Sequence, residues 1–139
     1  QDVADATDFV LGASIAVSRG FLSDVGLMAE DYFLYFEEID WAVRNRKLGS
    51  HAYETAFAHG ATVFHKAGRS IGSGSARAKR NAFADYWLAR SRLRFTWRHY
   101  RWLWPLHWLI CWGQILRRLL RRQGSNARAI LRATFGRPF

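Results

Sequence analysis

The strongest constraint on the fold lies in the second half of the chain, where aromatic and aliphatic residues are interleaved with arginine. Over residues 82–101 their pattern is typical of a helix. Pro105 suits the first turn of a new helix, which we expect to continue to about residue 122. A last short helix is expected at 126–134, after a break at 123–125. This half of the chain therefore predicts basic amphipathic helices.

The uncharged run at residues 102–116 is too short to span a bilayer. Fifteen helical residues reach about 22 Å, whereas the hydrocarbon core is about 30 Å thick. Leucines then alternate with arginines up to residue 122, a pattern that suits a helix lying in the plane of a membrane. The side chains expected to make this contact are Trp102, Trp104, Trp108, Trp112, Arg117, Arg118, Arg121 and Arg122. The alternative is a pair of helices that pack against another part of the protein.

Charge is divided sharply along the 139 residues. Ten of the eleven acidic residues lie at or before Glu54, and fifteen of the twenty-one basic residues lie between Arg77 and Arg137. A basic segment favours phosphate, in nucleic acid or in anionic lipid. The run at 102–116 is too hydrophobic for a groove that stacks bases, so we expect no nucleic-acid partner. Cys111 is the only cysteine, which fits a reducing compartment.

The first half reads as a mixture of short strands and helices. Apolar, partly β-branched runs predict strands at 9–18, 51–54 and 61–65. Helices are expected at 19–25 and 37–48, with Gly49 ending the second. Residues 68–74 are rich in Gly and Ser and predict a loop. The predicted class is thus mixed α/β, with one domain at 1–75 and a helical tail at 76–139.

Three carboxylates fall within four positions, directly after an aromatic run: Glu37, Glu38 and Asp40. Carboxylates this close raise each other's pKa and can hold a proton or a divalent metal. The alternative is a solvated start of a helix, with Asp40 paired to Arg44 four residues on.

Further short motifs lie on both sides of these carboxylates, across residues 8–72. They are Leu11-Gly12-Ala13-Ser14, Asp24-Val25-Gly26, Tyr32-Phe33, Phe36-Glu37-Glu38-Ile39-Asp40-Trp41, Gly49, Tyr53-Glu54-Thr55-Ala56 and Val63-Phe64-His65-Lys66-Ala67-Gly68-Arg69-Ser70. In this order they resemble the C-terminal half of the catalytic domain of inverting family 2 glycosyltransferases of the rhamnosyltransferase-like kind. The resemblance implies a fragment of a GT-A nucleotide-sugar transferase domain, followed by the basic helices.

The resemblance also implies roles for individual residues. Glu38 matches the catalytic base, although the family usually has Asp there, and Glu37 and Asp40 would orient it or the acceptor. His65 matches a histidine that helps to coordinate a divalent metal, Mn²⁺ or Mg²⁺, which holds the nucleotide diphosphate. The substrate-binding residues would be Gly12, Ala13, Ser14, Lys66, Arg69 and Ser70. For Gly12 to Ser14 a buried strand with a closely packed glycine is an equally good interpretation.

The sequence lacks an Asp-x-Asp segment after a strand and the βαβ half that would bind the nucleotide. Together with Gln1 at its start, this indicates a piece of a longer protein, inactive by itself without the N-terminal half. The implied activity is inverting transfer of a sugar such as rhamnose from a nucleotide-sugar donor. The acceptor would be a cell-surface polysaccharide or a lipid-linked glycan, at the inner, cytoplasmic face of the cell membrane, where the anionic surface binds the tail. The alternative function is a non-catalytic membrane- or partner-binding module.

Overall fold

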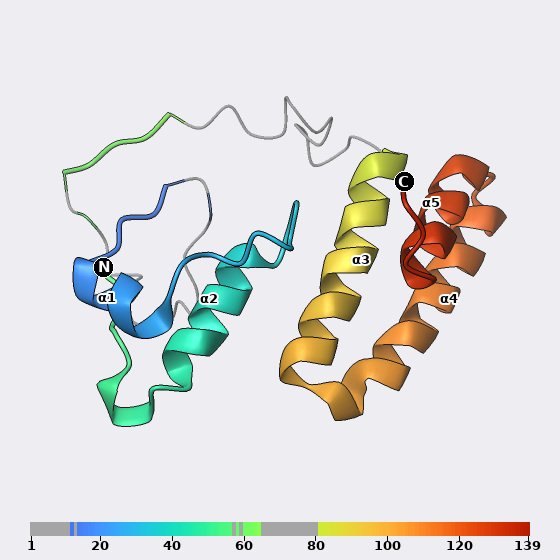
Figure 1. The fold of residues 1–139 in the computed structure, drawn as a ribbon. Coiled ribbons are helices and arrows are strands. Elements are labelled where there is room, and N and C mark those ends of the chain that lie inside the picture. The colour runs from blue at the N-terminus through green and yellow to red at the C-terminus, as the bar shows by residue number, and fades with distance from the viewer. Residues whose placement is uncertain (1–11, 13, 57, 59, 65–80) are drawn as a thin grey trace. The chain divides into compact units, whose positions relative to one another are not determined.

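The computed structural model describes residues 12, 14–56, 58, 60–64 and 81–139 (Figure 1). Their elements, in chain order, are α1 (Arg19–Val25), α2 (Glu37–Arg46), the 3₁₀ turn η2 (Gly49–His51), α3 (Ala82–His99), the 3₁₀ turn η3 (Arg101–Leu103), α4 (Trp104–Leu120) and α5 (Gly124–Thr134). The chain forms two compact units. Unit 1 holds the described residues up to 32 and 36–64, and unit 2 holds 33–35 and 81–139.

The predicted α/β class is wrong, because the described residues form helices and turns with neither strand nor sheet. The described parts of the expected strands, 14–18, 52–54 and 61–64, lack the pairing of a sheet. An apolar, β-branched run favours extended backbone, and Ser18 and Ala52 are indeed extended. A strand also requires a neighbour for its backbone hydrogen bonds, and the described segments supply none. This fold is therefore not that of a GT-A domain.

The predicted helices are confirmed, and local signals account for their ends. The Ser18 hydroxyl accepts a hydrogen bond from the Phe21 N–H (3.0 Å) and so caps α1. The Asn81 side chain caps α3 in the same way, through the Ala84 N–H (2.8 Å). Pro105 lies in the first turn of α4, where its missing N–H costs nothing. α2 ends at Arg46, earlier than predicted, so Gly49 does not cap it; Gly49 begins η2 with a left-handed φ of 62°, a conformation that glycine adopts readily.

Unit 1 is small and is held together by aromatic contacts between its helices. The Phe21 ring of α1 packs edge-on against Trp41 and Tyr53, with ring centroids 5.1 and 5.5 Å apart. The Trp41 indole donates a hydrogen bond to the Gly26 carbonyl (2.9 Å), and Asn45 both donates to and accepts from the Tyr53 backbone. These contacts attach α1 and the segment after η2 to α2.

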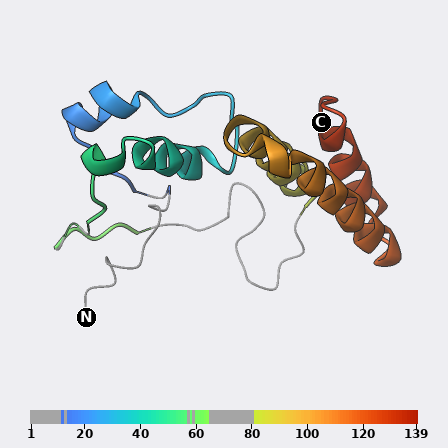
Figure 2. The ribbon, with the colours of Figure 1, turned by 90° about the horizontal axis from the view of Figure 1, so that it is seen from below.

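Unit 2 is a three-helix arrangement in which α5 packs against both α3 and α4 (Figures 1 and 2). Its core is formed by small and medium-sized side chains of the three helices: Tyr86, Ala89, Leu93, Cys111, Ile115, Ala127, Ala129, Ile130 and Ala133. Buried Asp85 accepts hydrogen bonds from Arg118 of α4 (2.8 Å) and Asn126 of α5 (2.7 Å), which joins all three helices. Residues 33–35 belong to this unit, since the Ser91 hydroxyl donates to the Leu34 carbonyl (2.7 Å).

Among the described residues, none of the helices is both long enough and apolar enough to cross a bilayer.

Candidate functional site

The acidic cluster forms the first turn of α2, which begins at Glu37 after two residues of unusual backbone conformation. Tyr35 and Phe36 both have left-handed φ angles, of 67° and 73°. Residues other than glycine rarely adopt this region, and the strain costs of order 1–3 kcal/mol for each. Such strain is typical of functional sites. The helix dipole favours the carboxylates at this end.

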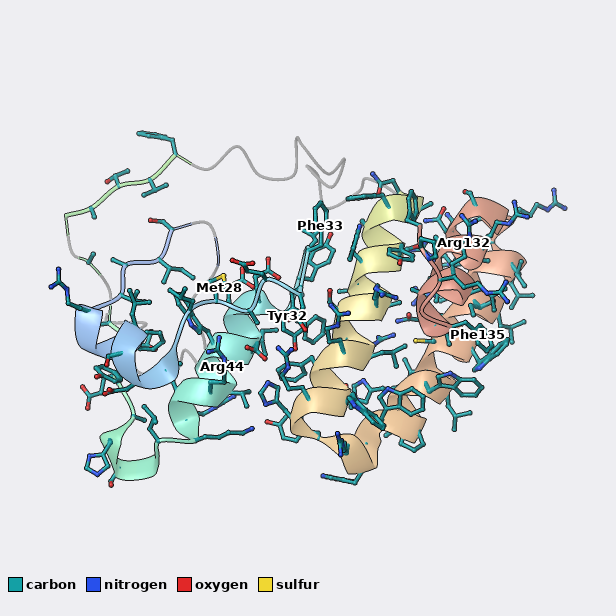
Figure 3. The ribbon with its side chains drawn as sticks, in the orientation of Figure 1. Met28, Tyr32, Phe33, Arg44, Arg132 and Phe135 are labelled. Atoms are coloured by element: carbon teal, nitrogen blue, oxygen red, sulfur yellow. The ribbon has the colours of Figure 1, made fainter. Side chains whose placement is uncertain are left out.

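Asp40 is fully buried and is part of the structure of unit 1. Its carboxylate accepts hydrogen bonds from the Arg44 Nε (2.8 Å) and the Tyr32 hydroxyl (3.3 Å). Arg44 also donates to the carbonyls of Val25 (2.6 Å) and Leu27 (2.7 Å), so one guanidinium ties the end of α1 to α2 (Figure 3). Asp40 therefore pairs with Arg44, as the alternative interpretation of the sequence predicted. A carboxylate without exposed surface cannot touch a substrate.

Glu37 is half-buried and carries an unusual carboxylate. Burial raises the pKa of Glu37 above its ordinary value; a backbone hydrogen bond opposes this, and the charge of Glu38 adds to it. Its Oε2 is buried without a hydrogen-bond partner in the part of the chain that the structure describes. Burying an unpaired acceptor is unfavourable, which favours a proton on this oxygen.

Glu38 lies directly against Gly12, which is twenty-six positions earlier in the sequence. A Cβ built on Gly12 would overlap the Glu38 Oε1 and would lie 2.8 Å from its Cδ. The carboxylate therefore occupies the space that any larger residue at position 12 would fill. The structure thus brings together two residues that sequence analysis had assigned to the same site.

The other predicted site residues are not gathered around this pair within the described ranges. Ser14 is exposed. Five lie outside the residues that the structure describes: Ala13, His65, Lys66, Arg69 and Ser70. In the described ranges there is also no group of three or more His, Cys, Asp or Glu side chains that could hold a metal ion.

The Glu38 carboxylate thus lies beside Gly12, and the preceding residue, Glu37, carries a carboxylate with a raised pKa. The Glu38 carboxylate can in principle accept a proton from a hydroxyl. Sequence reasoning missed Tyr32 as a partner of Asp40 and missed the left-handed pair Tyr35–Phe36. Aromatic residues carry no sequence signal for that conformation, because they rarely adopt it.

No family model matches the chain, and comparisons with curated proteins and with solved structures find no match either.

Proposed function

We propose that this chain is part of an inverting glycosyltransferase that moves a sugar, such as rhamnose, from a nucleotide-sugar donor to a glycan or lipid-linked acceptor. The reaction would take place at the inner face of the cell membrane. The observation that carries the proposal is the contact between the Glu38 carboxylate and Gly12. Both residues lie in segments that resemble motifs of that family, and they are far apart in sequence.

In this proposal Glu38 takes the proton from the acceptor hydroxyl. The oxygen then attacks the anomeric carbon of the donor sugar, from the face opposite the nucleoside diphosphate that leaves. Glu37, with its raised pKa, lies beside this base in the sequence and orients it. Asp40 acts through Arg44, which positions the first turn of α2. The left-handed Tyr35–Phe36 pair fixes where that turn begins.

The divalent metal that the resemblance implies stays a proposal for His65. Neutral imidazole is a good ligand for Mn²⁺ and a poorer one for Mg²⁺. The described residues contain no group of side chains that would complete a metal site with His65. The proposed proton transfer to Glu38 does not require a metal ion.

The test is sugar transfer by the full-length protein that carries this chain, measured as release of the nucleoside diphosphate. Glu38→Gln keeps the shape of the side chain but removes the proton acceptor, so kcat should fall about 10²–10⁴-fold with little change in donor affinity. Arg19→Gln, at an exposed position of α1, is the control and should leave kcat unchanged. If Glu38→Gln stays near wild type while Glu37→Gln is inactive, the base is Glu37. Absence of transfer from every nucleotide sugar would refute the proposal.

The second candidate is a non-catalytic module that binds a membrane or a partner. It is favoured by a different observation, the row of exposed apolar residues on α4. Turnover by the full-length protein separates the two candidates, since a binding module would release no nucleoside diphosphate.

A further inference from the structure

The two faces of α4 differ in what they contact. The inner face carries Trp104, Trp108, Cys111 and Ile115, which pack in or against the core of unit 2. The outer face carries four exposed leucines, at intervals of three, seven and four residues, that we call the leucine stripe: Leu106, Leu109, Leu116 and Leu120. Their exposed fractions lie between 53% and 77%. An apolar row of this length on one helix is typical of an interaction surface.

This assignment differs from the sequence expectation, in which four tryptophans made the contact. Trp104 and Trp108 are turned toward the core. Trp102 remains exposed in η3, just before α4, and Trp112 is partly exposed beside Phe135, which directly follows α5, with ring centroids 6.1 Å apart. The leucine stripe, together with Trp102 and Trp112, is therefore an exposed apolar surface.

The charged residues of unit 2 are almost all basic. Residues 81–139 hold twelve arginines and one acid, Asp85, which gives a formal charge of +11 by subtraction. Asp85 is buried and forms an ion pair with Arg118, so it adds no negative charge to the surface. Arg117 is exposed in the last turn of α4, between Leu116 and Leu120, and exposed Arg121 directly follows the helix. A partner with negative charge and an apolar interior is complementary to such a surface.

A shallow hollow on α5 adds to this pattern. It measures about 200 Å³ and is lined by Leu131, Arg132, Phe135 and Arg137. Figure 3 labels Arg132 of α5 and Phe135, which directly follows this helix. The Phe135 ring packs against Trp108 and Trp112 of α4. Two guanidinium groups beside two apolar side chains suit a phosphate carried by a lipid. The volume is below that of ordinary small-molecule sites.

We propose that unit 2 docks on an anionic lipid surface through the leucine stripe of α4. In this arrangement α4 lies in the plane of the membrane, Arg117 and Arg121 face the lipid phosphates, and the hollow on α5 takes one headgroup phosphate. A second copy of the chain fits less well, because it would bring the same unbalanced positive charge. A nucleic acid would leave the leucines without an apolar partner. The inference is independent of sugar transfer.

The experiment is flotation of the whole chain with vesicles of phosphatidylcholine alone or mixed equally with phosphatidylglycerol. We expect binding to the mixed vesicles only, weaker at high salt but still present, and reversed by carbonate. The variant Leu109→Gln/Leu116→Gln should lower partitioning at least about tenfold. Its control, Leu27→Gln/Phe64→Gln, removes two exposed apolar side chains from unit 1 and should bind as wild type does.

Charge is tested by Arg117→Gln/Arg121→Gln, which should weaken binding about fivefold for each arginine. Arg19→Gln/Lys47→Gln removes the same charge from exposed positions in unit 1 and should have little effect. Arg132→Gln tests the hollow. It removes one charge that faces a lipid phosphate in this proposal, so vesicle binding should weaken about fivefold. Circular dichroism that matches wild type shows that each variant is folded.

Four results would overturn the proposal. They are equal binding to both kinds of vesicle, absence of binding to either, and resistance to carbonate, which indicates a spanning segment. The fourth is a vesicle-free dimer or an oligonucleotide complex that Leu109→Gln/Leu116→Gln abolishes while vesicle binding is unchanged. In that case the stripe binds a second copy or a nucleic acid.

Discussion

Replacing Asp40 tests whether the acidic turn divides into one structural carboxylate and two functional ones. Asp40 is wholly buried, accepts hydrogen bonds from Arg44 (2.8 Å) and Tyr32 (3.3 Å), and belongs to the helix that also carries Glu38. In Asp40→Ala both donors lose their acceptor. Arg44 then keeps only its bonds to the Val25 and Leu27 carbonyls. We therefore expect the contact between α1 and α2 to weaken.

The magnitude follows from the burial of the two partners. Breaking a fully buried ion pair by removing one partner costs about 3–5 kcal/mol. Arg44 keeps 25% of its side chain exposed, so water partly compensates for its loss and we expect about 2–3 kcal/mol. Asp40→Asn keeps an acceptor for Tyr32 but loses the charge, and should cost about 1–2 kcal/mol. Glu38→Gln, at a half-buried position outside this network, should change stability by less than about 0.5 kcal/mol.

Hydrogen exchange of peptides covering residues 19–46 measures this local stability directly. A loss of about 2–3 kcal/mol corresponds to exchange roughly 30- to 150-fold faster. Peptides from α3 to α5 should be unchanged and serve as the internal control. The reasoning is refuted if Asp40→Ala exchanges as wild type does, or if Glu38→Gln is as destabilising as Asp40→Ala.

Three further predictions follow from the same contacts. Because burial raises the pKa of Glu37, the folded state binds more protons than the unfolded state, and unit 1 should lose stability as the pH rises through that raised pKa. Glu37→Gln should remove this pH dependence in hydrogen exchange; a persistent slope would contradict the assignment. Asp85→Ala should lower the stability of unit 2 by about 2–4 kcal/mol, because Arg118 and Asn126 both lose the buried carboxylate that accepts their hydrogen bonds. Thermal denaturation followed by circular dichroism measures this loss. Gly12→Ala should displace the Glu38 carboxylate and lower the kcat of the full-length protein about tenfold or more with little change in Tm, whereas wild-type turnover would show that the contact is not functional.

The helices could be predicted from sequence because their signals are local. Ser18 and Asn81 cap the helices that they precede, and Pro105 lies where a first turn tolerates it. No comparable local signal is sufficient to predict a strand. A β-branched run states a preference for extended backbone, but pairing depends on a second segment that the pattern does not specify. The mixed α/β prediction failed at that step.

The candidate site could be predicted in part for the same reason. The acidic turn is contiguous in sequence, so Glu37, Glu38 and Asp40 were found together. Their different roles depend on burial, which comes from tertiary contacts such as the one from Tyr32 to Asp40. Spacing alone offered Arg44 as a partner for Asp40, four residues on, but could not choose between that pair and an open carboxylate.

The outer face of α4 shows why an amphipathic pattern can predict a helix and yet leave its orientation open. Tryptophan and leucine are both apolar, so the sequence permits either set to face inward. The choice depends on which partner offers the better packing. Cys111 and Ile115 lie on the same side as Trp104 and Trp108, and α5 presents small alanines and the Phe135 ring to that side. Large indoles fill the space over small residues, and the leucines, with no partner in unit 2, remain on the outside beside Arg117 and Arg121. The surface proposed to meet lipid is therefore set by the packing of α5.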